Sequence, residues 1–544
     1  MKKTHAYSYW KIVWQQFKKN KIGCAALVII AIFVICGIYA PILASSKPIF
    51  LVYDGEIYFP LFRHLFYRGF FTKRLDIFFN IMMFATPVMV VTMLSLRRGR
   101  KAAMVTILSA VIALFLYLSF ATPKDPAKDA ALSAARQHII QEQLIVSDRD
   151  PLLEPFPIYE DWDFNLQHMN EYAKINMLIR YRLRKEQHHR LQKYYDSNNA
   201  DGFVIQTLWQ VAKENDENQI KRLEAKLQGK EGVYVKAFMQ MPFLAEEYQK
   251  KPTERKRKRL EKIRIIVGEY ESTIAKISFI KDRRKWLECE NAKILHLTMP
   301  LLKNFHWEDD AGGEQAINSI VKWWDLTRIN RKDLVAGLIF GIRISLVVGL
   351  LAVAAQLSIG IPIGSMAGYY GGKTDILVNR MLEIWEAMPT FFMLLMVVAI
   401  VQSKSIFLVI SVLGIFGWTG YSRFIRGEFL KQRSLPYVDA CHAMGFGDRR
   451  IVFSHILPNA IPPILTIIPF SIMAAITSEA GLSFIGLGEE GSCSWGVLMD
   501  EGRSAFPGES YLLWPPALML TTLLIAIALV GDAFRDALDP KMRK

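Results

Sequence analysis

Two long apolar runs of the sequence are separated by residues 437–460, Y-V-D-A-C-H-A-M-G-F-G-D-R-R-I-V-F-S-H-I-L-P-N-A. This pattern predicts a short helix, a turn at residues 445–447, and a second helix with Ile451, Val452 and Ile456 on one side. Pro458 is expected to stop the second helix because proline lacks a backbone N–H. A rigid helix–turn–helix between two membrane spans is suited to docking in a groove of a partner.

The composition around this stretch is typical of a membrane protein. The chain has 544 residues, of which 52% are hydrophobic, and a net charge of +16. Lys and Arg cluster beside apolar runs, which indicates cytoplasmic membrane boundaries and no nucleic-acid partner. The five cysteines show neither a disulfide framework nor metal-ligand spacing, and a bridge between Cys289 and Cys493 stays open. No metal or directly bound cofactor is predicted.

The apolar runs and charges divide the chain into six parts. These are an interfacial helix, a first span, an extracytoplasmic segment, a transmembrane hairpin, a soluble domain and a five-span core: residues 1–21, 22–44, 45–76, 77–120, 121–332 and 333–544. Trp10, Trp14 and Phe17 fall on one face of a helix that could lie in the headgroup layer. The first apolar run is long enough to cross about 30 Å of hydrocarbon, although a cleaved signal peptide is the alternative.

Basic residues predict the orientation of these spans. The turn R-R-G-R-K at residues 97–101 should remain in the cytoplasm, so residues 121–332 begin outside. About eight spans return the C-terminal Lys541, Arg543 and Lys544 to the cytoplasm, where the N-terminus is also expected. The predicted fold class is therefore an all-α polytopic membrane protein.

The soluble part, residues 121–332, mixes charges with scattered aromatic residues. Leu, Ile and Val alternate with charges at residues 213–227 and 255–269, which predicts amphipathic helices. We find no strong strand pattern there. The K-R-K-R run at residues 256–259 is interpreted as a solvated helix face, with an anionic ligand or lipid as the alternative.

Residues 367–374, A-G-Y-Y-G-G-K-T, fit a relaxed phosphate-binding loop. Such a loop needs a preceding strand and a following helix in a soluble sheet. An apolar span precedes this stretch instead. The glycines are therefore expected to form a tight turn between two helices.

The spacing of a known signature is kept by three segments: Asp439-Ala440-Cys441, then Gly445, then His455-Ile456-Leu457-Pro458. The sequence here resembles the C-type permease subunits of dipeptide and oligopeptide ABC importers, in which the first triplet is Glu-Ala-Ala. Further motifs from residue 334 onward match this family in order, among them G-W-T-G-Y-S-R-F-I-R at residues 417–426. K-P-I-F-L-V-Y-D-G-E-I-Y-F-P at residues 47–60 resembles the branch that includes the microcin C uptake permease.

The resemblance implies a type I importer fold with six spans, so the hairpin and the soluble domain are insertions. It implies a homologous B-type permease, two cytoplasmic ATP-binding subunits, an extracytoplasmic substrate-binding protein and a bacterial inner membrane. ATP and Mg would be used by the partner subunits, so the chain itself is no enzyme. Peptides are the expected substrate, while modified peptides and metals stay open. The coupling loop, residues 431–460, would contact the ATPase through Asp439, Ala440, Cys441, Gly445, Arg449, His455, Leu457 and Pro458.

Charged residues near the spans are candidates for the translocation path because a charge in lipid is costly. They are Arg343, Glu383, Glu386 and Glu479, with Asp375 and Arg380 close by. Most of them lie near the predicted ends of spans, so interfacial or structural pairing is the favoured role. A different function, a membrane-anchored sensor or scaffold that works through residues 121–332, also fits the sequence. The predicted helix–turn–helix favours the transporter.

Overall fold

The computed structural model describes residues 9–66, 74–96, 99–121, 170–198, 207–307, 318, 321–325, 327–329, 332–402, 404–489, 491–504 and 512–538. Helices dominate these ranges, which confirms the predicted all-α fold class. Several predicted features lie outside the described residues: residues 1–8, 97–98 and 122–169, and the basic C-terminal residues 541–544.

Seven described helices are long and apolar enough to span a membrane, and a bent pair makes an eighth, as expected. The seven are α2 (Lys21–Ile38), α5 (Arg74–Ser95), α6 (Arg100–Ala121), α13 (Leu334–Tyr370), α16 (Ile406–Arg433), α20 (Ile468–Leu482) with η3 (Ser483–Leu487), and α22 (Trp514–Leu538). The shorter helices are α1 (Tyr9–Phe17), α3 (Ala40–Leu43), α4 (Pro60–His64), α17 (Pro436–Ala443), α18 (Asp448–Arg450), η2 (Ile451–Ile456), α19 (Leu457–Leu465) and α21 (Trp495–Arg503).

The bent pair consists of α14 (Gly372–Ala387) and α15 (Thr390–Val401), which meet at 74°. The sequence predicts one continuous span there, whereas the structure breaks it at Met388 and Pro389. Met388 is extended, with ψ 117°, because a following proline disfavours the helical conformation. The A-G-Y-Y-G-G-K-T stretch covers the preceding turn, where Gly371 and Gly372 have φ of 65° and 53°. It joins two helices, as predicted.

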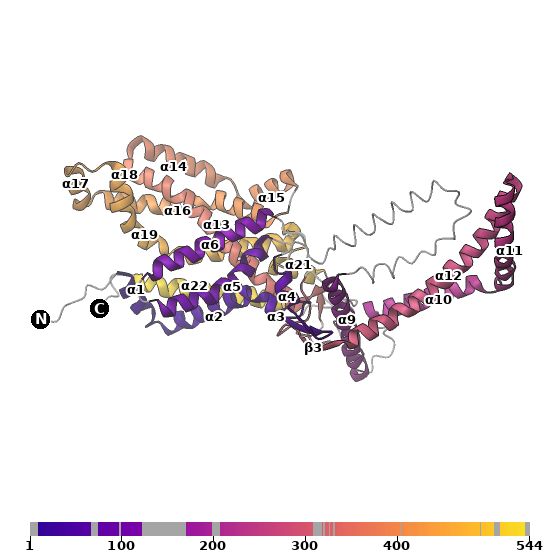
Figure 1. The fold of residues 1–544 in the computed structure, drawn as a ribbon. Helices are drawn as coiled ribbons and strands as arrows, with labels where there is room; N and C mark the ends of the chain where they lie inside the picture. Colours follow the sequence, from indigo (N-terminus) through magenta and orange to yellow (C-terminus); the bar gives the residue numbers. More distant parts are fainter. Residues whose placement is uncertain are drawn as a thin grey trace.

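The spans run together as an elongated bundle (Figure 1). Helix α1 and the C-terminal end of α22 lie at the same end of the bundle as α17 and α18. Helices α9 to α12, which belong to the predicted inserted domain, lie at the opposite end. In α1, Phe17 packs edge-on against Phe534 of α22, while Trp14 is 48% exposed. On the predicted aromatic face of α1, Phe17 therefore packs on the bundle, whereas Trp14 is partly exposed.

The inserted domain is mostly helical but also contains a strand that the sequence pattern does not reveal. Its helices are α9 (Glu171–Asn198), α10 (Leu208–Leu227), α11 (Glu231–Lys250) and α12 (Glu254–Ala292). Strand β3 (Ile294–Thr298) pairs antiparallel with β1 (Phe50–Tyr53), which pairs with β2 (Glu56–Tyr58). A further two-stranded sheet joins β4 (Arg328–Ile329) to β5 (Lys332–Asp333). The segment after the first span and the end of the inserted domain thus form one folded unit.

Close packing of α13 against α16 depends on glycines spaced four residues apart, Gly360, Gly364 and Gly368. A Cβ added at Gly364 would lie 2.0 Å from Cγ2 of Ile425 and 2.4 Å from the carbonyl oxygen of Ser422. Small residues at such positions let two membrane helices approach closely.

Gly364→Val is expected to push α13 away from α16 and to lower stability by about 1–3 kcal/mol or more, as overpacking does. Thermal unfolding of the purified protein in detergent measures the effect. Gly420→Val is the matched control, because a Cβ at Gly420 has nothing within 4 Å. Equal midpoints for the two variants would contradict this close approach.

Candidate functional site

The chain between α16 and α19 forms a projecting knob, residues 436–456, made of α17, α18 and η2. Gly445 follows α17 with φ 74°, the positive value expected for the turn. The N–H of Gly445 donates to the carbonyl of His442 (2.9 Å), and that of Phe446 donates to the carbonyl of Cys441 (3.1 Å). These two bonds satisfy helix-end carbonyls and form a Schellman motif, for which glycine is the preferred residue.

One side-chain bond fixes the knob to the end of α13, and a second bond ties the end of α13 to the end of α16. The Tyr369 hydroxyl, near the end of α13, donates to Oδ1 of Asp448 at 2.8 Å. Nη1 of Arg433, at the end of α16, donates to the carbonyl of Tyr369 at 2.9 Å. Within the knob, the Arg450 guanidinium lies 4.2 Å from the ring centroid of Phe446. A movement of the knob would therefore be shared by α13 and α16.

The predicted contact residues differ in exposure. Five are exposed, namely Asp439, Ala440, Gly445, Arg449 and Pro458. His455 and Leu457 are half-buried, and the His455 ring stacks on Phe446 with centroids 5.6 Å apart. Cys441 is only 5% exposed and packs in the core below the knob. It supports the knob from inside and offers no contact surface.

Two apolar side chains on the knob were missed by sequence reasoning. Met444 is 61% exposed and Phe453 is 65% exposed. Both lie outside the buried stripe of Ile451 and Ile456. The spacing of these isoleucines in the sequence could have shown which side of the helix is exposed. Large exposed apolar side chains on a projecting element are typical of protein–protein contact surfaces.

The expected helix stop at Pro458 is wrong. Helix α19 continues from Leu457 to Leu465, with Pro458 in its first turn. The preceding turn, η2, is π-helical, with backbone bonds to the fifth residue instead of the fourth. Proline is tolerated there because the first turn of a helix needs no N–H from it.

Among the path candidates, Arg343 is fully buried in a bonding hub. Its Nη1 donates to Oδ1 of Asp76 at 2.8 Å and its Nη2 donates to Oδ1 of Asn80 at 3.0 Å, both on α5. Its Nε donates to the carbonyl of Gly37 at 2.7 Å, and Nη2 lies 3.4 Å from that of Ile38. This geometry is structural pairing, the role that the sequence favours over the path, and it joins the inserted hairpin to the core.

The other candidates are dispersed. Glu383 pairs with Arg380 at 2.5 Å on the exposed face of α14, and Glu386 pairs with Arg423 of α16 at 2.5 Å. Asp375 accepts from Nη2 of Arg426 at 2.7 Å. The pairs of Glu386 with Arg423 and of Asp375 with Arg426 tie α14 to α16, whereas the pair of Glu383 with Arg380 lies within α14.

Glu479 of α20 is 4% exposed. Its Oε1 accepts from the Ser483 hydroxyl at 2.7 Å, and its Oε2 has no hydrogen-bond partner among the described residues. The structure thus does not gather Glu479 with the other predicted path residues.

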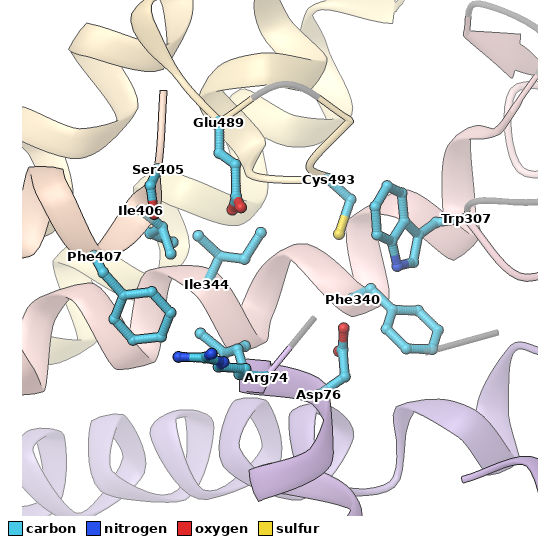
Figure 2. A pocket seen from close by; sticks show the side chains of 11 residues that line it. Arg74, Asp76, Trp307, Phe340, Ile344, Ser405, Ile406, Phe407, Glu489 and Cys493 are labelled. Atoms are coloured by element: carbon cyan, nitrogen blue, oxygen red, sulfur yellow. The ribbon is translucent and has the colours of Figure 1, made fainter. Parts of the chain in front are cut away.

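A cavity of about 320 Å³ lies where the inserted hairpin meets the core. Figure 2 shows Glu489 entering it from one side and Arg74 and Asp76 from the other, with Ile344 between them. None of the four path candidates is among the described residues that line it. Its polar walls reach the Arg343 hub through Asp76.

Two family models match parts of this chain. Residues 360–544 match the family model described as the binding-protein-dependent transport system inner membrane component. Residues 8–60 match the N-terminal transmembrane domain of oligopeptide transport permease C. Both matches lie outside the inserted hairpin and the helices α9 to α12.

Three relatives show the extent of the likeness. The chain is 36% identical to the peptidoglycan transport system permease protein YejE of Agrobacterium fabrum, over 40% of this chain and 57% of the relative. It is 35% identical to the inner membrane ABC transporter permease protein YejE of Escherichia coli, over 40% of this chain and 63% of the relative. It is also 35% identical to the oligopeptide transport system permease protein OppC of Haemophilus influenzae, over 40% of this chain and 70% of the relative. The aligned part thus spans less than two thirds of the first two relatives.

The spans and the projecting knob define a multi-pass membrane protein of the permease class. The chain belongs to the family of oligopeptide and dipeptide ABC importer permease subunits. Members of this family are membrane components of transporters and not enzymes.

Proposed function

We propose that this chain is a pore-forming subunit of an ATP-driven importer in the bacterial inner membrane. The observation that carries the proposal is the projecting knob with its exposed Met444 and Phe453. In this proposal the knob faces the cytoplasm and docks on one of two ATP-binding subunits. ATP and Mg act on those subunits, and this chain binds neither.

The contacts of the knob suggest how force would reach the spans. Asp448 and Arg433 both bond to Tyr369, so a push on the knob acts on α13 and α16 together. Those two helices are packed through glycines and would move as one body. ATP-driven closure would then shift the equilibrium between outward-facing and inward-facing states, by binding one of them more tightly.

The substrate and remaining partners are proposed from the relatives. Peptides are the proposed substrate, delivered by an extracytoplasmic binding protein at the end of the bundle opposite the knob. A homologous B-type permease would complete the pathway. The apolar outer faces of α14 and α15 suit such contacts, because Leu377 is 70% exposed and Ile400 is 72% exposed. Glu383 and Glu386 on α14 remain proposed path residues.

Phe453→Asp is expected to abolish co-purification of the co-expressed cognate ATPase, because a carboxylate would be buried in an apolar contact. Pull-down of the tagged permease followed by quantification of the ATPase measures this. Phe243→Asp is the matched control: Phe243 is 71% exposed but lies on α11, at the other end of the molecule. Retention of the ATPase by Phe453→Asp would refute the proposed docking surface.

A further inference from the structure

The inserted domain contains a cavity of about 560 Å³ between α9, α10 and α12. This volume lies within the range of about 300–1,000 Å³ that is usual for small-molecule sites. These helices lie at the end of the molecule far from the knob (Figure 1). The family models match residues 8–60 and 360–544, so neither covers this cavity.

The walls of the cavity are strongly basic. Six Lys and Arg side chains face two carboxylates, those of Asp216 and Glu288. Asp216 is already paired with Arg283 at 2.6 Å and lies 3.7 Å from Arg284. One of the two carboxylates is thus shared by two guanidinium groups, and the excess of positive charge remains.

The other four cations of the lining come from two facing helices. Arg180 and Arg184 lie four residues apart on α9 and so share one wall, and Lys185 is next to them. Lys213 reaches the cavity from α10. Arginine can bind carboxylate or phosphate oxygens through two parallel hydrogen bonds.

Aromatic rings complete the site. Trp209 of α10 lies with its ring centroid 4.8 Å from that of His188, and Nζ of Lys213 lies 5.7 Å from the Trp209 ring. Burial, together with the neighbouring His189 and Lys213, lowers the pKa of His188, which lies against Trp209 and is not itself among the residues that line the cavity. The site therefore combines a positive field with a flat apolar wall.

We propose that this cavity binds a ligand with at least two oxyanionic groups, held by Arg180, Arg184 and Lys213 and packed against Trp209. The ligand chemistry is that of clustered carboxylates or phosphates. This assignment concerns the inserted domain alone and does not depend on ATPase docking at the knob.

The test uses the full chain in nanodiscs of neutral phosphatidylcholine, titrated by calorimetry with pyrophosphate and, separately, with triglutamate. Saturable binding of either probe, weakened by added salt, is expected. Tighter binding of pyrophosphate would identify a phosphate ligand, and tighter binding of triglutamate a carboxylate ligand. Absence of binding by both probes would overturn the proposal.

Variants on one helix separate a built site from general attraction. Lys213→Glu is expected to weaken binding at least tenfold, and Lys213→Gln less. Lys221→Glu makes the same charge change on α10 at an exposed position outside the cavity and should leave binding unchanged. Equal losses in Lys213→Glu and Lys221→Glu would overturn the proposal. Unchanged thermal midpoints establish that each variant is folded.

Discussion

Asp76→Ala is expected to lower the free energy of unfolding by about 3–5 kcal/mol, the usual effect of removing one partner of a buried ion pair. Arg343 is 0% exposed and Asp76 is 5% exposed, so removal of the carboxylate leaves the buried guanidinium without its ionic partner. The guanidinium would keep its charge, because arginine does not deprotonate in proteins. Its remaining partners are the Asn80 amide oxygen and two backbone carbonyls, which are all neutral.

The effect should extend beyond one contact because the hub joins three spans. Arg343 lies on α13 and Asp76 lies on α5. The carbonyls of Gly37 and Ile38 lie at the C-terminal end of α2. A helix end carries a partial negative charge and unsatisfied carbonyls, which the guanidinium neutralises. Loss of Asp76 is therefore expected to loosen the inserted hairpin from the core.

Unfolding of the detergent-solubilised variants by heat or denaturant measures this prediction. Glu383→Ala removes a carboxylate from an exposed ion pair and should leave stability unchanged. Asp76→Leu combined with Arg343→Met removes both charges and should recover part of the loss. An Asp76→Ala protein as stable as the parent would show that the buried pair contributes little to the fold.

Gly445→Val is expected to reduce the affinity of the permease for the ATPase about tenfold or more, while the protein stays folded. A β-branched residue at φ 74° is strongly disfavoured, with a cost of about 1–3 kcal/mol. A Cβ at this position has nothing within 4 Å, so the strain is in the backbone and not in a collision. Relief of that strain would change the direction of α18 and of Phe453 beyond it.

Gly445→Asn is the matched control, since asparagine tolerates positive φ better than other side chains. Binding of purified ATPase to the immobilised permease would be compared for the two variants, together with thermal midpoints. We expect near-normal binding for asparagine and weak binding for valine. Indistinguishable affinities would mean that the left-handed turn does not position the docking surface.

The spans could be predicted from the sequence because length and hydropathy determine them directly. The turn at Gly445 was also accessible, since glycine beside a short helix is a local signal. The local signal at Pro458 is misleading. The proline is expected to stop the helix, but it follows a π-helical turn and lies in the first turn of α19. The exposed Phe453 could have been found from the spacing of the buried isoleucines around it.

Contacts between distant segments were not accessible in this way. Strand β3 pairs with β1, from which it is separated in sequence by the whole inserted domain. The five residues of β3 have a weak pattern, which does not show with which strand they pair. In the same way, Arg343 could be recognised as a costly charge, but its bond to Asp76 joins residues on different spans. Periodicity shows which face of an element is apolar and not which other element covers it.

The direction in which the knob faces is tested most directly by labelling Met444→Cys, made together with Cys289→Ser to remove the exposed native thiol. Spheroplasts and stripped inverted vesicles would be treated with a membrane-impermeant maleimide, with Leu301→Cys, at a residue 73% exposed near the inserted domain, as the opposite-side control. We predict that Met444→Cys reacts only in the inverted vesicles and Leu301→Cys only in the spheroplasts. Reaction of Met444→Cys in intact spheroplasts would contradict a cytoplasmic knob and, with it, the proposed coupling to an ATPase.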